Sequence, residues 1–319
     1  MKSRSYLVIV LGMFLSVPLL SQHTPNNTTS SAQARTQAAD CSLRRLDKCA
    51  LDVAKDQAGI WTSPLRLRAS DALWVVPFAS ATGASIYYDS DAMTHFGTSS
   101  AQRSFGSNVS KYSAPYVTFG AASGLYLLGA TTHNDHLRET GLLGAESVVD
   151  ASLLTLGLKY ATNRDRPYQR DGTGKFWPHG TRSINSDASM PSGHAAAAWA
   201  FARVLSMEYP DRPWLKLLAY GSALTISSAR VMARDHFPSD VLVGSTFGFL
   251  AGGYVVRHHS PKYKDSFSYS IAPSLGTSGG TYALSLTITP PKDFDLCRAF
   301  HAPGIRFLRK IDSGCTSTR

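Results

Sequence analysis

Residues 189–201 read SMPSGHAAAAWAF, and this stretch predicts the start of a closely packed helix. Pro191 restricts the backbone before the helix, and Ser192 is a residue type that favours the N-cap position. A helix that begins at Gly193 points unpaired N–H groups and the positive end of its dipole outward, which favours an anion. His194 follows in the first turn, within reach of that anion; the alternative is an ordinary N-cap with a solvent-facing imidazole.

Apolar segments of helical length occur on both sides of this stretch. They are separated by Gly, Pro, Asp and Asn, and six helices are expected, at 71–88, 114–130, 141–161, 194–208, 214–233 and 240–256. Their Gly, Ala and Ser residues permit close contacts, so the pattern predicts an all-α fold, a compact six-helix bundle. The uncharged runs are short for crossing a bilayer, and Glu146 and Asp150 interrupt one of them. With a mean hydropathy of −0.11, the chain is expected to be soluble or peripheral to a membrane.

The two ends of the chain differ from this helical domain, which is assigned to 66–258. Basic residues followed by an apolar run predict a signal peptide over 1–21, and hence an exported protein, periplasmic or secreted; an uncleaved anchor is the alternative. The polar residues that follow predict a flexible leader over 22–65. Apolar and polar residues alternate around GTSGG at 276–280, which predicts a β-hairpin appendage within a C-terminal tail over 259–319.

The cysteines and the net charge narrow the possible ligands. Cys41, Cys49, Cys297 and Cys315 predict disulfides in an exported protein, and of three possible pairings the short-range one is preferred. A zinc–cysteine site is disfavoured because neither pair has CxxC spacing or a close histidine. The formal net charge of +10 suits anionic substrates or membranes, whereas no basic run with interleaved aromatic residues indicates a nucleic-acid surface.

A second reactive cluster is KYATNRDRP at 159–167. Lys159 and Arg166 are seven residues apart, so they share a face if the helix continues until Pro167 stops it. Two cations on one face favour an anion between them. The alternative is a basic last turn that interacts with the helix dipole.

A third cluster is ARVMARDHFPSD at 229–240. Arg230 is expected to end one helix, His236 to lie in the connecting loop, and Asp240 to open the next helix. Asp240 can accept a hydrogen bond from one ring nitrogen of His236 and leave the other nitrogen as a nucleophile. The alternative is a purely structural pair.

In this order and spacing, the three clusters resemble the signature of the type 2 phosphatidic acid phosphatase superfamily. The matching positions are Lys159, Arg166 and Pro167; Pro191, Ser192, Gly193 and His194; and Arg230, His236 and Asp240. This superfamily includes lipid phosphatases, bacterial class A acid phosphatases and vanadium-dependent haloperoxidases, and the resemblance covers roughly 142–254. Ala229 departs from it, because the third motif usually has serine there; this affects the expected substrate subclass, not the proposed nucleophile.

The resemblance implies phosphoryl transfer with no metal and no other cofactor, although vanadate could occupy the phosphate site. The expected phosphate-binding residues are Lys159, Arg166, Ser192, Gly193 and Arg230. His236, held by Asp240, would attack phosphorus to form a phosphohistidine. His194, protonated at the start, would protonate the leaving alcohol and then take a proton from water.

The expected partner is a phosphorylated small molecule or a phospholipid, and peripheral contact with a membrane is left open, as is the oligomeric state. One alternative is a haloperoxidase in which His236 ligates vanadate; the length of 319 residues favours the phosphatase. Another is a non-catalytic module that binds phospholipid or envelope components. The two histidines with Asp240 favour an enzyme, because capture alone needs no nucleophile.

Overall fold

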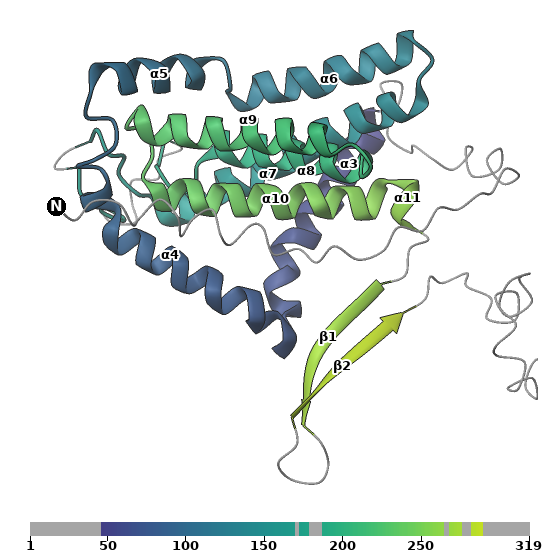
Figure 1. Ribbon diagram of the computed structural model, residues 1–319. Coiled ribbons are helices and arrows are strands. Elements are labelled where there is room, and N and C mark those ends of the chain that lie inside the picture. Colours follow the sequence, from purple (N-terminus) through teal and green to yellow (C-terminus); the bar gives the residue numbers. More distant parts are fainter. Residues whose placement is uncertain (1–45, 170–171, 179–186, 265–267, 276–281, 290–319) are drawn as a thin grey trace, which may run out of the picture. The chain divides into compact units, whose positions relative to one another are not determined.

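The computed structural model describes residues 46–169, 172–178, 187–264, 268–275 and 282–289 (Figure 1). The helices are α3 (Leu46–Thr62), α4 (Ala72–Ala92), α5 (Ser100–Lys111), α6 (Pro115–Thr131), α7 (Asp135–Thr162), α8 (Gly193–Glu208), α9 (Pro213–Met232), α10 (Pro238–His259) and α11 (Pro261–Lys264). Two short 3-10 helices, η1 (Ser63–Arg66) and η2 (Ala69–Asp71), join α3 to α4. Strands β1 (Ser268–Leu275) and β2 (Tyr282–Thr289) pair antiparallel, with Ser268 opposite Thr289.

The region predicted as the helical domain has one helix more than expected among its described residues. Helices α4 and α6 to α10 occupy the six predicted segments, and α5 is additional. The sequence of α5, SAQRSFGSNVSK, is mostly polar, so no apolar run predicted it. Ser99 caps this helix by accepting a hydrogen bond from the Gln102 N–H at 3.1 Å. Capping and contact with α9 therefore stabilise a helix that apolar periodicity does not reveal.

The flexible leader predicted over 22–65 extends too far along the chain, because residues 46–62 form helix α3. Helix α3 packs against α7. The Gln57 amide donates to the backbone carbonyl of Asp150 at 3.1 Å and to its carboxylate at 2.8 Å. These contacts with a residue 93 positions away order a segment whose composition alone suggests a linker.

Several predictions concern residues outside the described ranges. They include the signal peptide over 1–21, the first part of the leader and the glycine-rich turn at 276–280. Cys49 lies on α3, but Cys41, Cys297 and Cys315 fall outside the description. The predicted disulfide pairings therefore remain predictions.

Helix α8 contacts α6, α7, α9 and α10 (Figure 1). Three glycines of α10 face the α8 backbone at intervals of four residues: Gly244, Gly248 and Gly252. A Cβ atom on Gly248 would lie 2.1 Å from the carbonyl oxygen of Ala196, so only glycine fits at this distance. Ala195, Ala196 and Ala197 are completely buried. The small residues of α8 and α10 thus let the two backbones approach directly, which fixes the N-terminus of α8 against α10.

The outer helices present large apolar side chains to the surface. Exposed examples on α4, α6 and α9 are Leu73, Trp74, Val76, Tyr116, Phe119, Leu127, Leu128, Trp214, Leu217 and Leu218. Among the described helices, α7 and α10 are long and apolar enough to cross a membrane, but 56% and 61% of their apolar windows are buried within the protein. The core helices of a soluble protein have the same property.

Candidate active site

The first predicted cluster is assembled by a loop, not by a continuous helix. Helix α7 ends at Thr162, because Asn163 adopts a left-handed conformation with φ of 39°. The condition under which Lys159 and Arg166 would share one helix face, a helix that continues until Pro167, is therefore not met. Lys159 stays on the last turn of the helix, and Arg166 is a buried residue of the loop that follows. Arg166 reaches the site through the path of this loop, not through helical periodicity.

Arg166 and Arg230 form ion pairs with two carboxylates that the motif analysis did not single out. Arg166 donates to Asp187 at 2.7 Å, and Arg230 donates to Asp235 at 2.8 Å. The arginine side chains are nearly buried, whereas the carboxylate side chains are 55% and 28% exposed. The Nε atom of Arg230 is buried and has no hydrogen-bond partner in the part of the chain that the structure describes. The partly exposed carboxylates thus hold both arginines in position. The Nε–H of Arg230 can still donate a hydrogen bond to an anion.

The N-terminus of α8 offers unpaired donors at the same place. Ser192 is the N-cap and is completely buried, and its N–H donates to the backbone carbonyl of Asp240 at 2.9 Å. Its hydroxyl makes no capping hydrogen bond and has no other partner among the described residues. A Cβ atom added to Gly193 would meet only the Thr155 hydroxyl, at 3.8 Å, so protein atoms leave the space beside this residue open. The serine hydroxyl and the first-turn N–H groups are therefore available to an anion.

His236 lies in the loop between α9 and α10 and is 1% exposed. Its Nδ1 atom is 2.7 Å from the Ser189 carbonyl oxygen, which assigns the proton to Nδ1 and leaves the lone pair on Nε2. Asp240 does not orient this ring by the expected direct hydrogen bond, since its Oδ2 lies 3.8 Å from Nδ1. That oxygen accepts instead from the Ser189 hydroxyl at 2.5 Å and from the Phe237 N–H at 2.8 Å. Asp240 thus affects the imidazole through its charge and through Ser189.

Arg164 holds Asp240 in place and was missed by the motif analysis. Its guanidinium donates to Asp240 at 2.7 Å and to Asp89 of α4 at 2.7 Å. The rings of Phe176 and Phe237 lie 4.9 and 4.4 Å from the guanidinium carbon. The position of Arg164 within the first motif is a signal that was available in the sequence. Asp89 gave no such signal, because it is 75 residues away from its partner.

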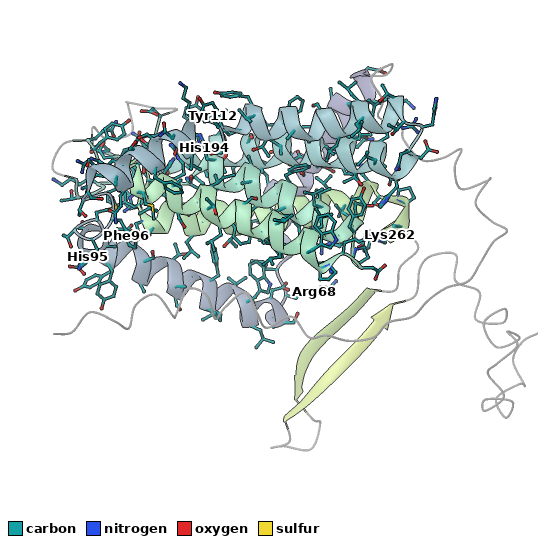
Figure 2. All side chains as sticks on the ribbon, turned by 45° about the horizontal axis from the view of Figure 1, so that its top comes forward. Arg68, His95, Phe96, Tyr112, His194 and Lys262 are labelled. Carbon is teal, nitrogen blue, oxygen red and sulfur yellow. The ribbon has the colours of Figure 1, made fainter. Side chains whose placement is uncertain are left out.

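The second imidazole of the site, that of His194, hydrogen bonds to the backbone of Ser110 at the end of α5. Figure 2 labels His194 and Tyr112 in this region. Burial, followed by the positive charge of Arg230, lowers the pKa of His194 to about 3. Burial likewise lowers the pKa of His236 to about 3. Both imidazoles are therefore neutral in the ligand-free protein at pH 7, although the expected role of His194 as an acid requires a proton.

The predicted site residues come from α7, α8, α9, α10 and two loops, yet they share one electrostatic environment. Burial, followed by the charge of Arg166, lowers the pKa of Lys159 to about 8, and Arg230 contributes in the same direction. The positive charges of Arg166 and Lys159 also act on His194. The structure therefore brings together three cations, a helix N-terminus and two neutral imidazoles, an arrangement suited to a tetrahedral oxyanion.

Known proteins resemble this part of the chain. Residues 142–264 match the family model described as PAP2 superfamily. A lipid A 1-phosphatase of Porphyromonas gingivalis is 38% identical over 80 residues, which are 25% of this chain and 17% of that protein. Lipid A 1-phosphatases of Rhizobium johnstonii and Rhizobium etli are 31% and 32% identical over 102 and 104 residues, each 32% of this chain and 41% and 43% of the relative. The matches thus span less than half of each relative, and no solved structure matches the chain significantly.

Proposed function

We propose that this protein is a phosphatase of lipid phosphate monoesters, because residues 142–264 match the PAP2 superfamily model. The observation that carries the proposal is the state of His236: it is buried and neutral, its Nδ1–H is bound to Ser189, and its Nε2 lone pair is free. A nucleophile in this state, within the field of Arg166 and Arg230, suits attack on a phosphoryl group.

The proposed reaction has two displacements at phosphorus. In the first, Nε2 of His236 forms a bond to phosphorus while the bond to the ester oxygen breaks, and His194 gives a proton to the departing alcohol. In the second, His194 takes a proton from water, the water oxygen bonds to phosphorus, and the P–N bond breaks to release phosphate. Lys159, Arg166 and Arg230 hold the equatorial oxygens together with the N-terminus of α8. Asp240, 3.8 Å from Nδ1, stabilises the positive charge of the phosphohistidine ring.

The substrate itself supplies the charge that makes His194 an acid. In the free protein burial and the nearby cations keep this imidazole neutral, as its pKa of about 3 indicates. A bound phosphate dianion offsets those cations and favours the imidazolium form. A substrate that arrives as the monoanion can also transfer its own proton, because a phosphate monoester has a second pKa of about 6. In this scheme the protein side chains neutralise the transferred group without a metal, and vanadate is expected to compete for the phosphate site.

An apolar groove that begins one turn after His194 on α8 supports a lipid substrate. The groove has a volume of about 330 Å³ and lies between α6, α8 and α9. Ala198, Phe201 and Ala202 line it, and they follow His194 by four, seven and eight residues, so they share its face of α8. We assign this groove to an acyl chain whose phosphate lies at His194. The exposed apolar side chains of α4, α6 and α9 would then contact a bilayer.

The relatives named lipid A 1-phosphatase make lipid A 1-phosphate the first ester to test. Phosphate release is measured from lipid A, phosphatidic acid, undecaprenyl pyrophosphate and p-nitrophenyl phosphate, with bromide and peroxide as a separate haloperoxidase assay. Turnover of a lipid substrate above p-nitrophenyl phosphate supports the proposal, and turnover of bromide alone contradicts it.

Variants of the two histidines test the mechanism. His236→Ala is expected to abolish turnover, whereas His194→Ala is expected to accumulate an acid-labile phosphoprotein with a substrate that has a good leaving group. His95→Ala is the matched control, because this imidazole is exposed and outside the site. Full activity of His236→Ala, or a phosphoprotein in that variant, excludes His236 as the nucleophile.

A further inference from the structure

A second cluster of ionisable side chains joins the C-terminal end of α10 to the interiors of α3 and α7. It consists of Asp56 of α3, Glu146 of α7 and His259 of α10. Nε2 of His259 lies 2.8 Å from a carboxylate oxygen of Asp56 and 3.8 Å from one of Glu146. The side chains of Asp56 and Glu146 are only 4% and 6% exposed. Three potential ligand atoms thus converge in the interior from helices that are distant in sequence.

One oxygen of Glu146 points into this cluster without a hydrogen bond. Its Oε1 atom is buried, and no described residue hydrogen bonds to it. Asp150, one turn further along α7, is completely buried, and its Oδ2 atom also lacks a partner. Two further carboxylates, those of Glu146 and Asp150, therefore lie near the Asp56–His259 pair, and a single imidazole offsets only part of the negative charge that three carboxylates can carry.

The spacing of the ligand atoms matches a tetrahedral transition-metal ion. Zinc binds histidine nitrogen and carboxylate oxygen at about 2.1 Å, so two ligand atoms of a tetrahedral site lie roughly 3.4 Å apart. The distances of 2.8 and 3.8 Å from the His259 nitrogen bracket this value. All three ligand atoms lie within 4.8 Å of one another. Side-chain adjustments of up to about 1.4 Å would bring the three ligand atoms to this spacing.

We propose that Asp56, Glu146 and His259 bind a divalent transition-metal ion, with Zn²⁺ as the best fit, and that Asp150 or water completes the site. An imidazole with carboxylates favours such an ion over Ca²⁺ or Mg²⁺, which prefer oxygen ligands alone. The ion would fasten α3 to α7 and α10, because each of the three helices contributes one ligand.

The proposed ion has a structural role and is independent of the proposed phosphatase function. His259 lies 19 residues after Asp240 on α10, which corresponds to roughly 28 Å along a helix. Figure 2 shows His194 and Lys262, which follows the cluster, at opposite ends of the helical region. The ion is therefore too far from His236 to take part in phosphoryl transfer.

The test uses the full chain, stripped of metal with a chelator and then titrated with Zn²⁺ alone. We expect one bound Zn²⁺ per chain by calorimetry and elemental analysis, and an increase of several degrees in the melting temperature. Asp56→Asn, Glu146→Gln and His259→Gln are each expected to weaken binding at least tenfold. Asp135→Asn is the matched control, because it removes an exposed carboxylate charge of α7 outside the cluster and should bind Zn²⁺ like the wild type.

The Glu146→Gln variant distinguishes the loss of a metal ligand from misfolding as the cause of weaker Zn²⁺ binding. Without metal this variant removes an uncompensated buried charge, so its melting temperature should equal or exceed that of the stripped wild type. With Zn²⁺ it should lose the stabilisation that the wild type gains. No Zn²⁺ binding by the wild type, or equal binding by the three ligand variants, overturns the proposal. Phosphate release by the stripped protein measures the phosphatase function separately, so failure of one proposal does not decide the other.

Discussion

Substitution of Asp89 by asparagine tests the buried network that supports the candidate nucleophile. Asp89 accepts from Arg164 at 2.7 Å and from the Ser239 hydroxyl at 2.5 Å, and it is 1% exposed. Burial raises the pKa of Asp89 and Arg164 opposes that increase, so the intact ion pair contributes little net stability. Removal of the carboxylate charge alone leaves the buried guanidinium of Arg164 partly uncompensated.

The size of the effect follows from this imbalance. Loss of one partner of a buried ion pair costs about 3–5 kcal/mol, and we expect the lower end because Arg164 keeps Asp240 as its second carboxylate. At about 2–4 °C per kcal/mol, the melting temperature should fall by roughly 6–12 °C. A shift of Asp240 should also lower kcat about tenfold, which corresponds to about 1.4 kcal/mol of transition-state stabilisation. KM should change less, because none of the phosphate-binding residues is altered.

The assay compares Asp89→Asn with Asp91→Asn, the same substitution at an exposed position two residues later on α4. Melting temperature is followed by intrinsic fluorescence, and kcat by phosphate release from the best substrate of the panel. Equal melting temperatures and equal kcat values for the two variants would refute the view that α4 supports the site through Arg164.

Three further substitutions have separate expected outcomes. Gly248→Ala places a Cβ 2.1 Å from the Ala196 carbonyl and should destabilise the protein by about 1–3 kcal/mol, measured by denaturant unfolding; wild-type stability would contradict the close contact. The pKa of Lys159 is lowered to about 8, so its side chain is charged below that pH and activity should fall as the pH rises above it. Lys159→Arg should move this loss of activity to higher pH. An unchanged pH profile would exclude Lys159 as the origin of the loss. Ser192→Ala removes an unpartnered buried hydroxyl and should raise KM about tenfold with little change in melting temperature; an unchanged KM would exclude a phosphate contact.

The sequence predicted the helices that carry continuous apolar runs. Helices α4 and α6 to α10 lie at the expected segments, because burial of an apolar face determines them locally. Helices α3 and α5 were missed, because contacts with α7 and α9 support helices whose own composition is polar or mixed. Local patterns do not contain such long-range contacts.

The same division applies to the candidate site. The residue types and spacings of the three clusters, at 159–167, 191–194 and 230–240, determine which side chains are available for phosphate chemistry. Only the tertiary structure decided how these side chains are held: the Ser189 carbonyl binds His236, and Asp240 is fixed by Arg164. These contacts depend on loop paths and on the close packing of α8 against α10, which no spacing within one segment specifies. The sequence thus determines which reactive side chains are present. Packing between distant segments determines how these side chains are oriented and whether they carry a proton, because packing buries them.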